Sequence, residues 1–394
     1  MLEERPSQFK VCYRNQIILM EGGAAHGVTG GKEEFLVSDG HTAFPLTIEK
    51  VYPFYSEMKS TKGIPWPFED RIVTAFQKVL GEKARLQLYI FPDANGRDVI
   101  LYKLSEVQHL FSCINTEEEA SLVLQLNAQG RVHFTVTDPR VTDHGLSRLN
   151  KDFPLDNLES VIRAAQHYHW HLLRENPHYS FSNNTGLDSK VALDFYKLKQ
   201  TGTSVKSVGD PIEKVIVGKD VIVKVVADDT TWYGIELKNK TDVPFYPYLF
   251  FFDNSDLSIR ESFSILDILL FLQISPISTE PYFLPPFGVN HEVDPPLRRN
   301  GSLTIGYSSN DSGKVHPGGS GPFVYECRPG QDVDVGFLKL FLSNQYIDLS
   351  NLLQGVTTAL DEGNIRGTKK VVALADGICQ WVSMVVTVVQ ERKK

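Results

Sequence analysis

The chain has 394 residues, 42% of them hydrophobic and 22% charged, which is typical of a folded protein with two or three domains. Lys and Arg total 40 against 48 Asp and Glu, and the formal net charge of -8 argues against a general nucleic-acid-binding protein. The four cysteines are widely spaced and form no CxxC pair, so a reducing, cytoplasmic setting is favoured over a disulfide framework or a structural zinc site.

Residues 1–108 are expected to form a small β-rich domain with one short helix. A glycine-rich link, 21–32, joins the second and third expected strands. It fails as a phosphate-binding loop, because the Walker spacing needs glycine in place of His26 and serine or threonine in place of Glu33. It also fails the dinucleotide pattern at Ala24, so we predict a strand-linking loop and no cofactor. The spacing predicts strands over 9–13, 16–20, 34–37, 44–52, 85–91 and 99–104, and a helix over 68–80.

Residues 109–200 are expected to hold a hairpin, 121–136, and an amphipathic helix from Asp156 to Asn176, with Asp156 and Glu159 arranged like a capping box. The helix carries His167 and His171, which are four apart and face the same way. Such a pair can bind zinc, but the metalloprotease motif needs a glutamate where Tyr168 stands, and no third ligand is identifiable. The alternative is a packed amphipathic helix without metal.

Residues 201–394 are expected to form an antiparallel β-sandwich, since strand follows strand with turns between them. Residues 201–210, rich in Gly, Ser and Thr, predict a linker. An apolar insert near 260–280 is too short to cross a bilayer, which takes about 20 residues, and Asp267 interrupts it. We therefore expect no membrane span, no secretory signal in the charged N-terminal residues, and a fold that is mostly β with some α. The expected strands are 214–217, 221–226, 231–239, 246–252, 302–307 and 381–390.

The segment Pro322–Ser343 predicts a strand, a turn at Arg328–Gly330, and a second strand. Val333, Val335 and Phe337 alternate with polar residues, but Leu338, Leu340 and Leu342 then fall on the opposite face, and Lys339 falls on the formerly apolar side. A change of phase of this kind predicts either a bulge near Gly336 or a strand buried on both faces.

Cys327 lies in Glu326–Gly330, a segment similar to the Gln-Ala-Cys-Arg-Gly that carries a caspase nucleophile. A nucleophilic cysteine needs a base, and the nearest upstream histidines are His316 and His291, neither of which follows a convincing apolar strand. A cysteine at a strand end before a Pro-Gly turn is the structural alternative.

Five segments lie in order along the chain: Glu21–Thr29, Thr142–Leu149, Tyr246–Asp253, Ser302–Tyr307 and Gly330–Leu340. Together they resemble the non-catalytic C-terminal region of the metacaspase-like caspase-domain proteins of mushroom-forming fungi. The resemblance spans nearly the whole chain, and in that family a caspase-like peptidase domain precedes this region. The chain looks as if it begins after that domain, and the family's catalytic histidine and cysteine have no convincing counterparts here. Residues 260–280 depart from the pattern and are either retained intron or a helical insertion.

The resemblance implies a non-enzymatic, structural or protein-interaction module whose partner is a caspase-like domain, in the same chain or in another. One alternative is a caspase-like cysteine peptidase using Cys327. A second is a ligand-binding β-sandwich with an aromatic platform, although aromatic residues at strand spacing are more often core. The platform residues would be Trp232, Tyr233, Tyr246, Tyr248 and 250–252.

Overall fold

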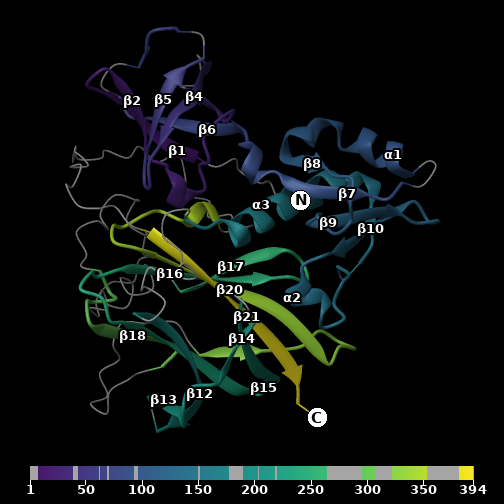
Figure 1. Cartoon of the computed structure of the whole chain (residues 1–394), viewed down its shortest axis with the longest axis vertical. Helices are drawn as coiled ribbons and strands as arrows, with labels where there is room; N and C mark the ends of the chain where they lie inside the picture. Colours follow the sequence, from purple (N-terminus) through teal and green to yellow (C-terminus); the bar gives the residue numbers. More distant parts are fainter. Residues whose placement is uncertain are drawn as a thin grey trace, which may run out of the picture.

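The fold was obtained as a computed structural model, and it has three parts, a barrel, a small mixed sheet with helices and a large β-sandwich (Figure 1). The helix α3 (Leu158–Leu173) lies between them. The structure describes residues 8–38, 43–61, 63–68, 71–92, 96–149, 151–176, 190–202, 204–217, 220–263, 295–307, 322–352 and 381–393.

The N-terminal part is a closed antiparallel barrel with the strand order β1-β2-β5-β4-β3-β6. The helix expected over 68–80 is wrong, because β6 occupies this segment and closes the barrel between β1 and β3. Two neighbouring strands supply partners for its backbone groups and override a helix-like spacing of apolar residues. The strands are β1 (Gln8–Arg14), β2 (Ile17–Met20), β3 (Glu34–Ser38), β4 (Ala43–Val51), β5 (Ser56–Ser60) and β6 (Val73–Val79).

The glycine-rich link contains the short helix η1 (Ala24–His26) and then closes around the buried side chain of Glu33. This carboxylate accepts hydrogen bonds from the backbone N–H groups of Thr29 (3.1 Å), Gly30 (3.0 Å) and Gly81 (3.3 Å). Backbone amides that could hold a phosphate therefore hold an internal anion instead. The link thus joins strands, as the sequence predicts.

The second part is a five-stranded sheet with the order β11-β10-β9-β7-β8, in which β7 runs parallel to β8 and β9. The boundary expected at residue 108 is wrong, because it falls between β7 and β8 of this one sheet. The strand expected over 99–104 is also wrong: α1 (Gly96–Lys103) buries Ile100 and exposes Tyr102. The other elements are η2 (Glu82–Ala84), β7 (Leu86–Ile90), η3 (Ser105–Leu110), β8 (Phe111–Cys113), β9 (Leu122–Leu126), β10 (Arg131–Val136), α2 (Pro139–Thr142) and β11 (Phe153–Pro154).

The expected long helix is confirmed as α3, preceded by η4 (Leu155–Asn157), but the expected capping box does not form. The N-cap residue is Asn157, without a side-chain cap. Asp156 pairs with Lys103 of α1 at 2.8 Å, and Glu159 pairs with Arg163 at 2.6 Å. Both carboxylates thus find cations instead of backbone N–H groups.

The C-terminal part is a ten-stranded assembly that folds over on itself as a sandwich, with the path β13-β12-β15-β21-β20-β16-β17. It begins at Val191, before the boundary expected at 201, and the expected linker 201–210 is largely hairpin between β12 and β13. Pairing is antiparallel except between β15 and β21, which is parallel. The strands are β12 (Val191–Thr201), β13 (Ser204–Val208), β14 (Lys214–Val217), β15 (Asp220–Asn239), β16 (Tyr246–Asp253), β17 (Ser258–Phe263), β18 (Gly301–Ile305), β19 (Phe323–Tyr325), β20 (Val333–Ser343) and β21 (Trp381–Arg392).

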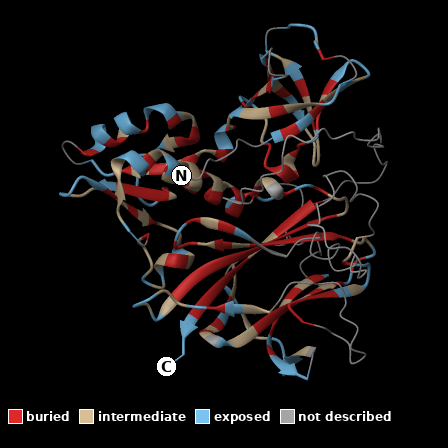
Figure 2. Ribbon diagram, turned by 180° about the vertical axis from the view of Figure 1, so that it is seen from behind, coloured by how far each residue is buried: buried red, intermediate tan, exposed pale blue. Residues whose placement is uncertain are grey.

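The strand β20 is buried on both faces, which confirms the second explanation for its change of phase. Its pairing with β16 and β21 runs through Gly336 without a bulge. Leu338 and Leu340 enter the core between the two layers of the sandwich, while Phe337 and Phe341 enter the core around α3. Figure 2 shows this run of buried strands through the large sheet.

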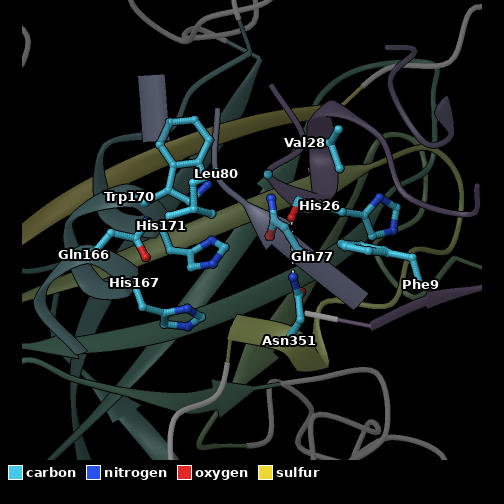
Figure 3. A pocket seen from close by; sticks show the side chains of 11 residues that line it. Phe9, His26, Val28, Gln77, Leu80, Gln166, His167, Trp170, His171 and Asn351 are labelled. Carbon is cyan, nitrogen blue, oxygen red and sulfur yellow. Dashed lines mark hydrogen bonds between the residues drawn. The ribbon is translucent and has the colours of Figure 1, made fainter. Parts of the chain in front are cut away.

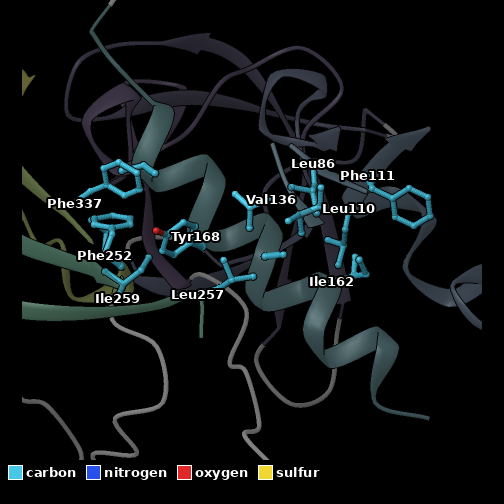
Figure 4. Close-up of a cluster of buried hydrophobic side chains, with 14 of the residues drawn as sticks. Leu86, Leu110, Phe111, Val136, Ile162, Tyr168, Phe252, Leu257, Ile259 and Phe337 are labelled. Atoms are coloured by element: carbon cyan, nitrogen blue, oxygen red, sulfur yellow. The ribbon is translucent and has the colours of Figure 1, made fainter. Parts of the chain in front are cut away.

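The core around α3 joins the five-stranded sheet to the sandwich. Tyr168 of α3 packs edge-on against Phe252 of β16, with ring centroids 5.4 Å apart, and Ile162 enters the same cluster from the other side of the helix (Figure 4). An amphipathic helix thus serves two apolar surfaces at once.

The strands predicted on either side of the Arg328–Gly330 turn form as β19 and β20, but they do not pair with each other, because β19 pairs with β15. Of the insert near 260–280, residues 260–263 belong to β17 and the rest lies outside the described residues. In the part that the structure describes, no helix has the length and apolar character needed to cross a bilayer.

Candidate functional site

A small cavity of about 50 Å³ lies where the barrel, α3 and the short helix η6 (Ser350–Leu352) meet (Figure 3). In Figure 3 the α3 side chains occupy one side of the cavity, and His26 and Phe9 from the barrel occupy the other. The lining residues are Phe9, His26, Gly27, Val28, Gln77, Leu80, Gln166, His167, Trp170, His171 and Asn351.

His26 is placed by η1, which ends at Gly27 with a φ of 94°, a left-handed conformation that glycine adopts without strain. Its Nδ1 accepts a hydrogen bond from the backbone N–H of Gly23 at 3.1 Å, so the ring carries its proton on Nε2. Burial, and after it the positive charge of Arg174, lowers the pKa of His26 to about 3. The imidazole is therefore neutral at physiological pH.

His167 and His171 contact each other, with ring centroids 4.4 Å apart, as their spacing predicts. His167 Nε2 donates a hydrogen bond of 2.9 Å to the Leu352 carbonyl oxygen. Because this nitrogen carries a proton, it cannot also bind a metal ion. Burial lowers the pKa of His167 to about 4. Burial also lowers the pKa of His171 well below its ordinary value, and the nearby basic groups His167, Arg174 and Lys339 act in the same direction. Among the described residues, no group of three or more metal-binding side chains forms, so the histidine pair has no third ligand there.

Behind the histidines lie two buried basic side chains, Arg174 and Lys339, with exposed fractions of 4% and 0%. Nζ of Lys339 donates hydrogen bonds of 2.6 Å to the carbonyl oxygens of Leu172 and Arg174, and so caps the C-terminal end of α3. Burial, and after it the charge of Arg174, lowers the pKa of Lys339 well below its ordinary value. The Arg174 guanidinium lies 4.7 Å from the centre of the Phe341 ring, a cation–π contact. Burial lowers the pKa of Arg174 to about 9, which leaves it charged at pH 7.

Cys327 lies at the far end of the sandwich from this cavity, between backbone groups. Its Sγ is 3.4 Å from the Gln390 carbonyl oxygen and 3.8 Å from that of Asp332. Burial raises the pKa of the thiol, and the Asp334 carboxylate raises it further. The charged groups acting on the thiol are carboxylates and arginines, with no imidazole among them in the described residues, and His291 and His316 both lie outside those residues.

The aromatic residues considered as a platform belong to the core. Tyr246, Tyr248, Phe250 and Phe252 are all buried in the cluster around α3, which confirms the expectation that aromatic residues at this spacing are core. Tyr233 is also buried, and Trp232 packs against a small separate cluster. These side chains are therefore too buried to form the exposed aromatic platform that was considered.

Sequence reasoning found His167, His171 and the unusual position of Lys339, but it missed Arg174 and His26. Arg174 lies three residues after His171 on the same helix face, a spacing that could have linked the two. No local signal brings His26 to α3, because that contact depends on how the barrel packs.

Comparison with protein families, with curated proteins and with solved structures finds no significant match for this chain.

Proposed function

We propose that the chain is a non-enzymatic C-terminal region associated with caspase-like proteins of the peptidase C14 type, and that it acts as a structural or protein-interaction module. Three of the segments that carry the resemblance support this proposal, since Tyr246–Asp253, Ser302–Tyr307 and Gly330–Leu340 coincide with β16, β18 and β20. These strands build the interior of a scaffold. Residues selected for packing there need no catalytic role.

The single observation that carries the non-enzymatic role is the setting of Cys327. A nucleophilic cysteine works as a thiolate, which positive neighbours or a paired imidazole stabilise. Here burial and the Asp334 carboxylate raise the pKa of the thiol although Arg392 and Arg328 act in the opposite direction, and Sγ donates to carbonyl oxygens. Those oxygens accept hydrogen bonds and would repel a thiolate.

The proposed partner is a caspase-like domain, in the same chain or in another, and the proposed location is the cytoplasm. Cys12, Cys113 and Cys327 are free thiols, which suits a reducing compartment. Sedimentation of the purified chain mixed with a caspase-like domain of the resembled family should give a complex. Independent sedimentation of both at about 100 µM would remove the interaction role and leave only the structural one.

The catalytic question is tested with a peptide vinyl sulfone and intact-mass analysis. Cys113, which is exposed, provides an internal reference for an ordinary thiol. We expect Cys327 to react no faster than Cys113 and no peptide to be cut. Saturable, stoichiometric labelling of Cys327, together with peptide cleavage that is lost in Cys327→Ser, would overturn the proposal in favour of a cysteine peptidase.

A further inference from the structure

The guanidinium of Arg174 is buried and has no hydrogen-bond partner in the described part of the chain. None of its three nitrogen atoms has a hydrogen-bond acceptor within the described residues, although the side chain is only 4% exposed. Its one close contact of an electrostatic kind is the face of Phe341. An uncompensated buried charge is strongly unfavourable, so a site of this kind is typically completed by an anion.

The neighbouring groups do not neutralise this charge. Lys339 is a second basic group and supplies no negative charge, and the carbonyl oxygens of Leu172 and Arg174 already accept its hydrogen bonds. His171 and His26 are neutral, because burial and the charge of Arg174 lower the pKa of both. Among the described residues, the Arg174 guanidinium therefore keeps both its unused N–H donors and its positive charge.

The backbone of Gly27 lies close to the Arg174 guanidinium, the Trp170 indole N–H and the His171 ring. A Cβ atom at this glycine would lie 2.9 Å from Nη1 of Arg174 and 2.9 Å from Nε1 of Trp170. It would also lie 3.4 Å from Cε1 of His171, whose Nδ1 is buried and has no partner in the described part of the chain. Figure 3 shows Trp170 and His171 side by side at the edge of the cavity.

We propose that this junction binds a carboxylate group, which accepts hydrogen bonds from the Arg174 guanidinium and the Trp170 indole N–H beside Gly27. A carboxylate is a planar monoanion that matches a guanidinium in shape and neutralises a single charge. The group enters beside Trp170, which is only partly buried.

The carboxylate has two possible sources, a free small acid and an acidic side chain of a bound polypeptide. Both present the same chemistry to Arg174, so the site itself does not depend on the source. The proposal is also independent of the caspase association, because a catalytic or a non-catalytic chain would bind the anion equally.

The test is the melting temperature of the full chain in acetate or formate at constant ionic strength, with chloride as the balancing salt. We expect a saturable rise of about 2 to 5 °C, as for a ligand that binds only the folded state. Arg174→Met should abolish the rise, and Trp170→Phe should weaken it. The matched control is Arg163→Met on the same helix, which should keep the full rise because Arg163 already pairs with Glu159.

A second measurement needs no variant. Saturation-transfer NMR on the wild-type chain should show bound acetate that formate displaces, so the proposal stays testable if Arg174→Met does not fold. An equal response to chloride, a persistent response in folded Arg174→Met, or no bound acetate would each overturn the proposal. If a peptide with a central glutamate displaces acetate and its glutamine counterpart does not, the source is a polypeptide. If neither peptide displaces acetate, the source is a free acid.

Discussion

Acid should destabilise this fold through its buried histidines. The folded chain lowers the pKa of His26 from 6.5 to about 3 and that of His169 from 6.5 to about 4, in both cases mainly by burial. Asp138 opposes the effect at His169 and Arg140 adds to it, while the charge of Arg174 adds to it at His26. A histidine that is harder to protonate when folded gives stability that is complete above pH 6.5 and is lost as the pH falls toward the folded pKa.

The size of the effect follows from the difference between the two states. Each such histidine costs about 1.4 kcal/mol for every pH unit below 6.5, or about 2 kcal/mol between pH 7 and pH 5. His26 and His169 together should therefore remove about 4 kcal/mol over that range, and His167 and His171 act in the same direction. That is a large fraction of the roughly 5 to 15 kcal/mol that a folded protein has.

The assay is urea unfolding followed by tryptophan fluorescence at several pH values between 5 and 8. The slope of the unfolding free energy against pH counts the protons taken up on unfolding, and we expect at least two between pH 6 and pH 5. His169→Gln should lower the slope by about one proton, or about 1.4 kcal/mol per pH unit. Gln166→Met, a buried change on the same helix without a titrating group, should leave the slope unchanged. Uptake of less than one proton by the wild-type chain would refute the reasoning.

Two further substitutions test the packing. Gly336→Ala should destabilise the chain by about 1 to 3 kcal/mol in urea unfolding, because its Cβ would lie 2.3 Å from Cζ of Phe251. Gly330→Ala should cost about 1 kcal/mol, because its φ is 79° although no atom lies within 4 Å of the new Cβ. Equal costs for the two variants would contradict this reasoning. Glu33→Gln should cost about 2 kcal/mol, since a neutral amide with one acceptor oxygen replaces a carboxylate that accepts several backbone hydrogen bonds. An unchanged urea midpoint for Glu33→Gln would show that those bonds contribute nothing.

Regular alternation made many of the strands predictable, and the failures occur where local spacing fits two structures. Ala75 and Val79 also fit a helical face, yet β6 forms because β1 and β3 flank it on both sides. Ile100 lies in an apolar run that suits a strand, but as part of α1 it reaches the core while Tyr102 stays exposed. In both cases the decision comes from distant neighbours, which a local pattern does not contain.

The strand β15 shows a different limit. The two expected strands, 221–226 and 231–239, are correct in position but form one continuous strand that serves both layers of the sandwich. Between them Asp228 accepts hydrogen bonds from the backbone N–H groups of Thr230 and Thr231, an arrangement typical of a turn. The turn signal was therefore real, but it marks a local irregularity at which the pairing with β19 shifts register.

The candidate site could be found only in part for the same reason. The spacing of His167 and His171 is a property of one helix, and the sequence displays it directly. The burial of Arg174 depends on Phe341 in β20 and on Gly27 in the barrel, which lie far from it along the chain. An arginine at the end of an amphipathic helix ordinarily reaches solvent. It becomes a buried charge without a hydrogen-bond partner, among the described residues, only because three parts of the chain close over it, so the site exists only when all three are docked.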